Sequence, residues 1–150
     1  MTMEYKEITL KQMCPSIKWF FRLESESSQI LIISFKGTYR YGSSGNKDAD
    51  LMLGIIFLGY KLFQPQKIVL DLSELDYMWG NKLLNVLHIG KGKSFAIVVG
   101  SKCKEGIISL TEAKKSEDDM INVFDSVDEA VSYLQENPVS FTFYEIVVNI

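Results

Sequence analysis

The chain has 150 residues, the size of a single domain, and at this length a protein can bury roughly two-thirds of its unfolded surface without metal or disulfide support. Hydrophobic residues make up 47% of it and aromatic residues 12%, which argues against intrinsic disorder. The net charge of −3 argues against a dedicated nucleic-acid binder, which needs a basic face to contact phosphates.

The cysteine content and the hydropathy indicate the compartment. The only cysteines are Cys14 and Cys103, without a C-x-x-C motif, and we interpret them as free thiols in a reducing cytoplasm. The first residues do not resemble a signal peptide, and the longest apolar run, Leu51 to Leu58, is far short of the ~20 residues that span a bilayer. We therefore expect a cytoplasmic protein without membrane insertion.

The first third of the chain predicts a hairpin followed by a helix. Residues Ile17 to Glu24 and Ile30 to Lys36 are rich in aromatic and β-branched side chains and predict two antiparallel strands. The preceding segment, Tyr5 to Leu10, is either a short strand or a loose arm. A helix is predicted from Lys47 to Lys61, with Asn46 or Asp48 as its cap.

That predicted helix is unusually apolar between Leu51 and Leu58. A helix without a clear polar face has to be covered on more than one side. The cover comes either from other parts of the same chain or from a second subunit, and the sequence leaves both alternatives open.

The segment from Lys67 to Leu87 predicts the centre of the fold. Ile68 to Leu72 is typical of a strand covered on both faces, as in a parallel sheet. A polar turn follows, where Asp76 is a candidate N-cap for a helix that includes Trp79 and continues with leucines at helical spacing: Leu83, Leu84 and Leu87. In such a helix, Gly80 would allow a close approach to the sheet.

The last third of the chain predicts further α/β units. We expect parallel strands at Phe95 to Val99 and Ile121 to Phe124, with a short helix from Gly100 to Leu110 and a loop from Thr111 to Asp119 between them. Ser126 and Glu129 form a capping-box pattern that predicts a final helix.

The tail, residues 139–150, has a strand-like pattern of apolar residues. It would have to pair with the N-terminal strands or with another protomer, because a long apolar edge aggregates. The expected fold is therefore one α/β domain with a four- to six-stranded mixed sheet and helices packed on it, a core at about 30–135, additional N-terminal strands in 1–29 and a C-terminal strand extension in 139–150.

Several of these segments resemble the STAS domain, the family of anti-sigma-factor antagonists and of the cytoplasmic tails of sulfate transporters. Asp71-Leu72-Ser73 is similar to the strand end of that family, Gly80 with Leu83 and Leu84 to its helix start, and Ser126 to Ala130 to its closing helix. The resemblance covers about Ile30 to Gln135. It implies a bacterial, regulatory protein-interaction domain rather than an enzyme.

The residues at the turn depart from that family in one respect. Met78 and Trp79 occupy the positions of the two serines of the family, one of which is the usual phosphorylation site, and Tyr77 that of the preceding aspartate. The resemblance therefore implies a domain that phosphorylation at this turn does not switch.

No catalytic set emerges from the sequence. Asp71, Glu74 and Asp76 gather near a strand end where ligands bind in open α/β sheets, but a capped turn explains them better. His88 is the only histidine, and a position at a helix end accounts for it. Gly92-Lys93-Ser94 lacks the upstream glycine of a phosphate-binding loop. We expect no catalytic residues, no metal and no cofactor.

The most informative pair is Met78 and Trp79, which are either an exposed apolar patch for a partner or part of the core beneath the tail. The expected function is a non-catalytic interaction module that binds a protein partner or associates with itself. Its candidate partner-binding residues are Ser73, Asp76, Tyr77, Met78, Trp79 and Asn81, next to the apolar helix. The alternatives are a structural homodimer built on the tail and the apolar helix, or a carrier of a small apolar ligand.

Overall fold

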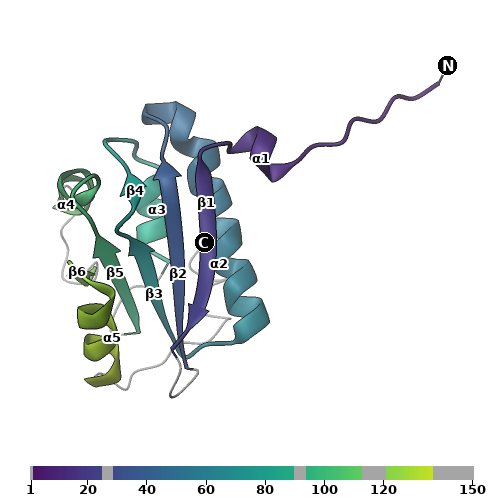
Figure 1. Cartoon of the computed structure of the whole chain (residues 1–150). Helices are drawn as coiled ribbons and strands as arrows, with labels where there is room; N and C mark the ends of the chain where they lie inside the picture. The colour runs from purple at the N-terminus through teal and green to yellow at the C-terminus, as the bar shows by residue number, and fades with distance from the viewer. Residues whose placement is uncertain (1, 25–28, 90–93, 113–120, 137–150) are drawn as a thin grey trace.

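A mixed β-sheet forms the centre of the computed structural model, which describes residues 2–24, 29–89, 94–112 and 121–136 (Figure 1). The sheet has the order β1-β2-β3-β5-β6, and β1 is antiparallel to β2 while the neighbouring pairs beyond β2 are parallel. The strands are β1 (Ile17–Leu23), β2 (Ile30–Thr38), β3 (Lys67–Leu72), β5 (Phe95–Val99) and β6 (Val123–Phe124). The predicted mixed α/β sheet and its antiparallel hairpin are confirmed.

Strand β3 is wholly buried, as its continuous apolar run predicts. It lies between β2 and β5 and is parallel to both, with Ile68 opposite Leu31 and Phe95. Alternate side chains of β3 enter separate cores, Leu70 on one face of the sheet and Val69 on the other. Asp71 shares the face of Val69 because side chains alternate along a strand.

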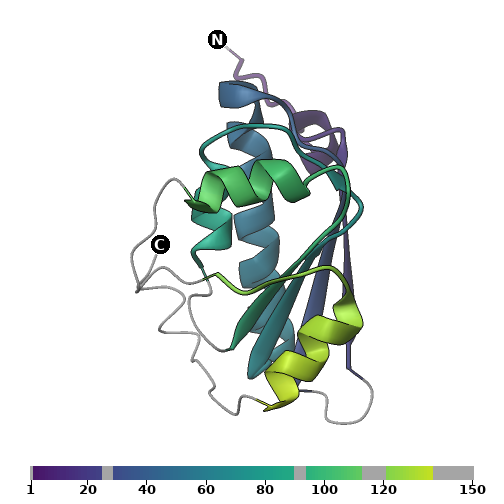
Figure 2. The ribbon, with the colours of Figure 1, turned by 90° about the vertical axis from the view of Figure 1, so that its left-hand side faces the viewer.

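Helices cover both faces of the sheet (Figure 2). Helix α5 (Val127–Glu136) packs on one face through Ala130 and Leu134. The other face holds the larger core, to which three helices contribute: α2 (Asn46–Phe63), α3 (Leu83–Leu87) and α4 (Lys104–Glu112). No helix within the described residues is long and apolar enough to cross a membrane.

Helix α2 buries most of its apolar residues within its own domain. Met52 and Ile56 are completely buried, whereas Leu58 and Leu62 remain exposed. The predicted caps, Asn46 and Asp48, are wrong, because the N-cap is Gly45 and no side chain makes a cap hydrogen bond there. The carboxylate of Asp48 bonds instead to the backbone and guanidinium of Arg40.

The predicted start of the helix after β3 is also wrong. Leu75–Asp76 is a short strand, β4, that pairs in parallel with Gly37 and Thr38 at the end of β2. Asp76 is not the helix cap, because the N-cap of α3 is Lys82, and Gly80, with a φ of +147°, interrupts a right-handed helix between the two. Helix α3 therefore begins only after Lys82, and Trp79 precedes it.

The ends of the chain differ in part from the predictions. Residues Tyr5 to Thr9 form neither helix nor strand, and a short helix, α1, occupies Leu10–Met13. The amide of Glu129 donates to Ser126 Oγ at 3.2 Å, one half of the predicted capping box. Helix α4 extends to Glu112, so the predicted loop begins later than expected. The tail 139–150 and the segment Gly92-Lys93 lie outside the described residues.

Candidate functional site

The predicted partner-binding segment forms a corner with the loop that follows β2. The Tyr39 amide donates to the Asp76 carbonyl at 2.9 Å, and the Gly42 amide donates to the Trp79 carbonyl at 3.2 Å. The Tyr77 amide donates to Lys102, in the connection after β5, at 3.1 Å. The polypeptide thus holds residues 76–79 from both sides by backbone hydrogen bonds.

Two buried tyrosines anchor this corner from below. The rings of Tyr39 and Tyr77 pack edge to face with centroids 5.1 Å apart, and the Tyr77 hydroxyl donates to the Gly80 carbonyl at 3.0 Å. Burial raises the pKa of Tyr77 to about 12. Burial also raises the pKa of Tyr39, and the nearby Tyr77 and Asp48 add to that shift. Both phenols are protonated at neutral pH, and the Tyr77 hydroxyl anchors the corner through its hydrogen bond to Gly80.

Glycines allow the two loops to approach each other. Gly42 has a φ of +55°, and a Cβ atom there would lie 2.6 Å from the Trp79 ring. At Gly80, a Cβ atom would lie 2.9 Å from the Tyr39 ring. Any larger residue at these positions would displace an aromatic side chain, so the packing of the corner depends on both glycines.

The outer surface of the corner is apolar. Met78 and Trp79 are 60% and 61% exposed, and Tyr41, which precedes Gly42, is 54% exposed. We call these three residues the Trp79 corner. Large aromatic side chains held by a fixed backbone lose little conformational entropy when a partner covers them. Such residues are typical hot spots of protein interfaces.

The predicted site residues separate into three groups. Met78, Trp79 and Asn81 are exposed, whereas Tyr77 is buried and supports the corner from inside. Asp76 is half-buried in β4. Ser73 lies elsewhere, because its hydroxyl and amide donate to Asp71 Oδ1 at 2.6 and 3.1 Å. The sequence did not identify Tyr41 as part of the site. The one pattern that could have indicated it is the alternation of aromatic and polar residues in Tyr39-Arg40-Tyr41.

A second group of polar side chains lies on the sheet face that carries α5. Asp71 Oδ2 accepts hydrogen bonds from Ser34 Oγ at 3.0 Å and from Arg22 Nη2 at 3.3 Å. Lys36 pairs with Glu74 at 2.6 Å, and its ammonium lies 5.0 Å from the centre of the Phe20 ring. These residues border a hollow of about 520 Å³. Both oxygens of Asp71 accept hydrogen bonds, Oδ2 from Ser34 and Arg22 and Oδ1 from Ser73.

The described residues contain no cluster of three or more histidine, cysteine or acidic side chains that could hold a metal ion. Cys14 and Cys103 are buried, and burial is the main cause that raises the pKa of each thiol. A thiol with a raised pKa is a poor nucleophile. His88 stands at the C-terminal end of α3, as predicted.

Comparison with known proteins gives no relative for this chain: no family model matches it, and no curated protein matches it.

Proposed function

We propose that this protein is a non-catalytic, STAS-like interaction domain that binds a protein partner through the Trp79 corner. The single observation that carries this proposal is the exposure of Met78 and Trp79 on a segment whose backbone is hydrogen-bonded on both sides. Exposed large apolar side chains on a backbone held in place by hydrogen bonds are typical of a protein-interaction site. A surface side chain that only filled space would not need such a support.

The central position of β3 and its parallel pairing with β5 are both consistent with the resemblance to STAS domains. If the resemblance holds, the partner meets the turn at which relatives are phosphorylated. Met78 and Trp79 have no hydroxyl group, so they cannot be phosphorylated. Phosphorylation at these two positions therefore does not regulate the proposed complex.

The test compares two exposed aromatic residues. The wild-type chain, Trp79→Ala and Phe20→Ala are used to capture partners from the source cells, and the captured protein is then titrated against each by calorimetry. Phe20 is a matched control because it is also an exposed aromatic but lies on the edge strand β1. Loss of a hot-spot residue typically weakens binding by about 2 kcal/mol or more, roughly thirtyfold in Kd.

We expect Trp79→Ala to weaken the complex to that extent and Phe20→Ala to leave it unchanged, with both variants folded by circular dichroism. A partner that binds Trp79→Ala as tightly as the wild type would reject the Trp79 corner as the binding surface. If both variants lost the same binding free energy, the partner would recognise exposed apolar surface in general and not the Trp79 corner.

A further inference from the structure

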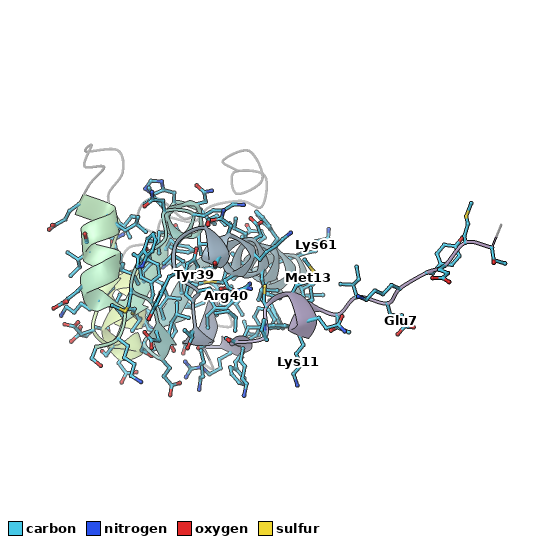
Figure 3. All side chains as sticks on the ribbon, turned by 90° about the horizontal axis from the view of Figure 1, so that it is seen from above. Glu7, Lys11, Met13, Tyr39, Arg40 and Lys61 are labelled. Carbon is cyan, nitrogen blue, oxygen red and sulfur yellow. The ribbon has the colours of Figure 1, made fainter. Side chains whose placement is uncertain are left out.

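The N-terminal arm, residues 2–9, extends away from the body of the domain (Figures 1 and 3). Its large side chains Met3, Tyr5 and Ile8 are 79%, 88% and 69% exposed. Exposing this much apolar surface on one short segment is unfavourable in water. Because the arm extends away from its own domain, we expect another surface to cover it.

The root of this arm is fixed. Thr9 caps α1, since the Gln12 amide donates to Thr9 Oγ1 at 3.2 Å and the Thr9 amide donates to Gln12 Oε1 at 3.0 Å. Arg40 Nη2 donates to the Met13 carbonyl at 2.9 Å and joins α1 to the body. To fold back, the arm would have to reverse before Thr9, and a turn of four residues would consume about half of it.

A groove of about 480 Å³ begins at the root of the arm. Leu10 and Met13 of α1 border it on one side, and Leu51, Gly54, Ile55 and Leu58 of α2 on the other. Gly54 leaves this groove open, because a Cβ atom there would meet no atom within 4 Å. The groove is thus a largely apolar depression. It stays open because Gly54 has no side chain to fill it.

We propose that the arm of a second copy of this chain occupies the groove, and that the two copies exchange arms about a two-fold axis. The arm ends at Thr9 and the groove begins at the next residue, Leu10, so one axis near α1 brings each arm to the groove of the other copy and closes the dimer. A buried Tyr5 alone would contribute about 150–250 Å². Both arms and both grooves together would reach the ~1,000 Å² that a specific interface requires.

The charges of the two surfaces agree with this arrangement. The arm carries Glu4, Lys6 and Glu7, a net charge of −1 over residues 2–9, and Lys47 borders the groove. Asp50, the acidic residue of the groove, is already paired with Lys82 at 2.8 Å. An arm with one net negative charge therefore meets a groove that offers Lys47 and whose own carboxylate is already paired. The proposal is independent of the proposed function, because the groove shares no residue with the Trp79 corner.

The first test measures the oligomeric state of the full chain by sedimentation equilibrium over a range of concentrations. Gly54→Arg places a long side chain in the groove from a position where the Cβ atom meets no atom within 4 Å, and Gly54→Ala is the matched control that leaves the groove open. We expect the wild type and Gly54→Ala to dimerise and Gly54→Arg to raise the dimer Kd at least tenfold, with all three folded by circular dichroism. A wild type that stays monomeric throughout, or a Gly54→Arg variant that dimerises like the wild type, would overturn the proposal.

The second test distinguishes exchange from folding back. The double variant Ile8→Cys with Gly54→Cys is oxidised in the full chain, and the product is sized under denaturing conditions. A covalent dimer supports arm exchange, whereas an internally cross-linked monomer or the absence of any cross-link overturns it. The two single variants are the controls, because the native Cys14 also borders this groove.

Discussion

The guanidinium of Arg40 binds the completely buried carboxylate of Asp48 through two parallel contacts, Nη2 to Oδ1 and Nε to Oδ2, each 3.0 Å long. The Arg40 amide donates a third hydrogen bond to Oδ2 at 2.9 Å. The pair ties the loop after β2 to the first turn of α2 and, through Met13, to α1. Arg40, Met13 and Lys11 are labelled around this junction in Figure 3.

We expect Arg40→Ala to lower the free energy of unfolding by about 3–5 kcal/mol, because it leaves the Asp48 carboxylate buried without its cation. Lys82→Ala is the matched control, since it breaks an ion pair of similar length with Asp50 that is exposed to solvent. Exposed pairs contribute roughly 0–1 kcal/mol. Urea denaturation of both variants checks the prediction, and similar losses in the two would contradict it.

This pair also shows what the sequence could and could not predict. The apolar run of β3 and the aromatic strand β1 are local patterns, and both strands were found. The role of Asp48 was not, because its partner Arg40 lies in the preceding loop and a helix cap was the nearer explanation. Propensity favours a cap wherever an acidic residue opens a helix, and here the ion pair of the buried Asp48 with the half-buried Arg40 overrides it.

The candidate site was predicted in part for the same reason. Exposed Met78 and Trp79 belong to the predicted segment, but the strand β4 was missed because it depends on a non-local pairing with Gly37 and Thr38.

The contact made by Lys67 could not be predicted either, because the sequence indicates Lys67 only as part of the central strand. Its ammonium is buried and donates to the Leu134 carbonyl in the last turn of α5, a contact between segments far apart in the sequence.

The two buried tyrosines give opposite predictions for removal of a hydroxyl. The Tyr77 hydroxyl donates to Gly80, so Tyr77→Phe should cost about 1 kcal/mol of stability. The Tyr39 oxygen makes no well-formed hydrogen bond, although the backbone of Leu83 lies near enough to influence its ionisation. Removing it should therefore be neutral or stabilise the fold by up to ~1 kcal/mol. Thermal melts of both variants measure the difference, and equal destabilisation would refute it.

The same tyrosines predict a loss of stability at high pH. Burial raises the pKa of Tyr77 from 10.0 to about 12, so between these values the unfolded chain has released a proton that the folded chain retains. Stability falls as pH rises wherever the folded state binds more protons. The contribution of the protonated Tyr77 to folding stability is fully present below pH 10 and is lost as the pH approaches 12. In Tyr77→Phe the decline should be shallower, which denaturation at a series of alkaline pH values would reveal.

Two glycines of α2 should respond in opposite directions to the same substitution. Gly54→Ala should raise the stability by about 1 kcal/mol, because alanine favours a helix and its methyl group meets no other atom. At Gly59 a Cβ atom would lie 2.6 Å from the Phe21 ring and 3.1 Å from Leu31. Gly59→Ala should therefore destabilise by roughly 1–3 kcal/mol through overpacking. Urea unfolding measures both, and a stabilising Gly59→Ala would show that the Phe21 ring moves freely.

The position of the Trp79 ring should depend on Gly42. A methyl group at Gly42 would both oppose its φ of +55° and collide with the ring at 2.6 Å, so Gly42→Ala should displace Trp79 and lower the stability by about 1–2 kcal/mol. In a Trp19→Phe background the emission of Trp79 reports its surroundings directly. Ser43→Ala, at an exposed position in the same turn, is the control. If the emission of Gly42→Ala matched that of the control, the ring would not depend on the glycine. The contact with Gly42 would then have no part in holding the ring, and the support of the binding surface would rest on the backbone hydrogen bonds of residues 76–79 alone.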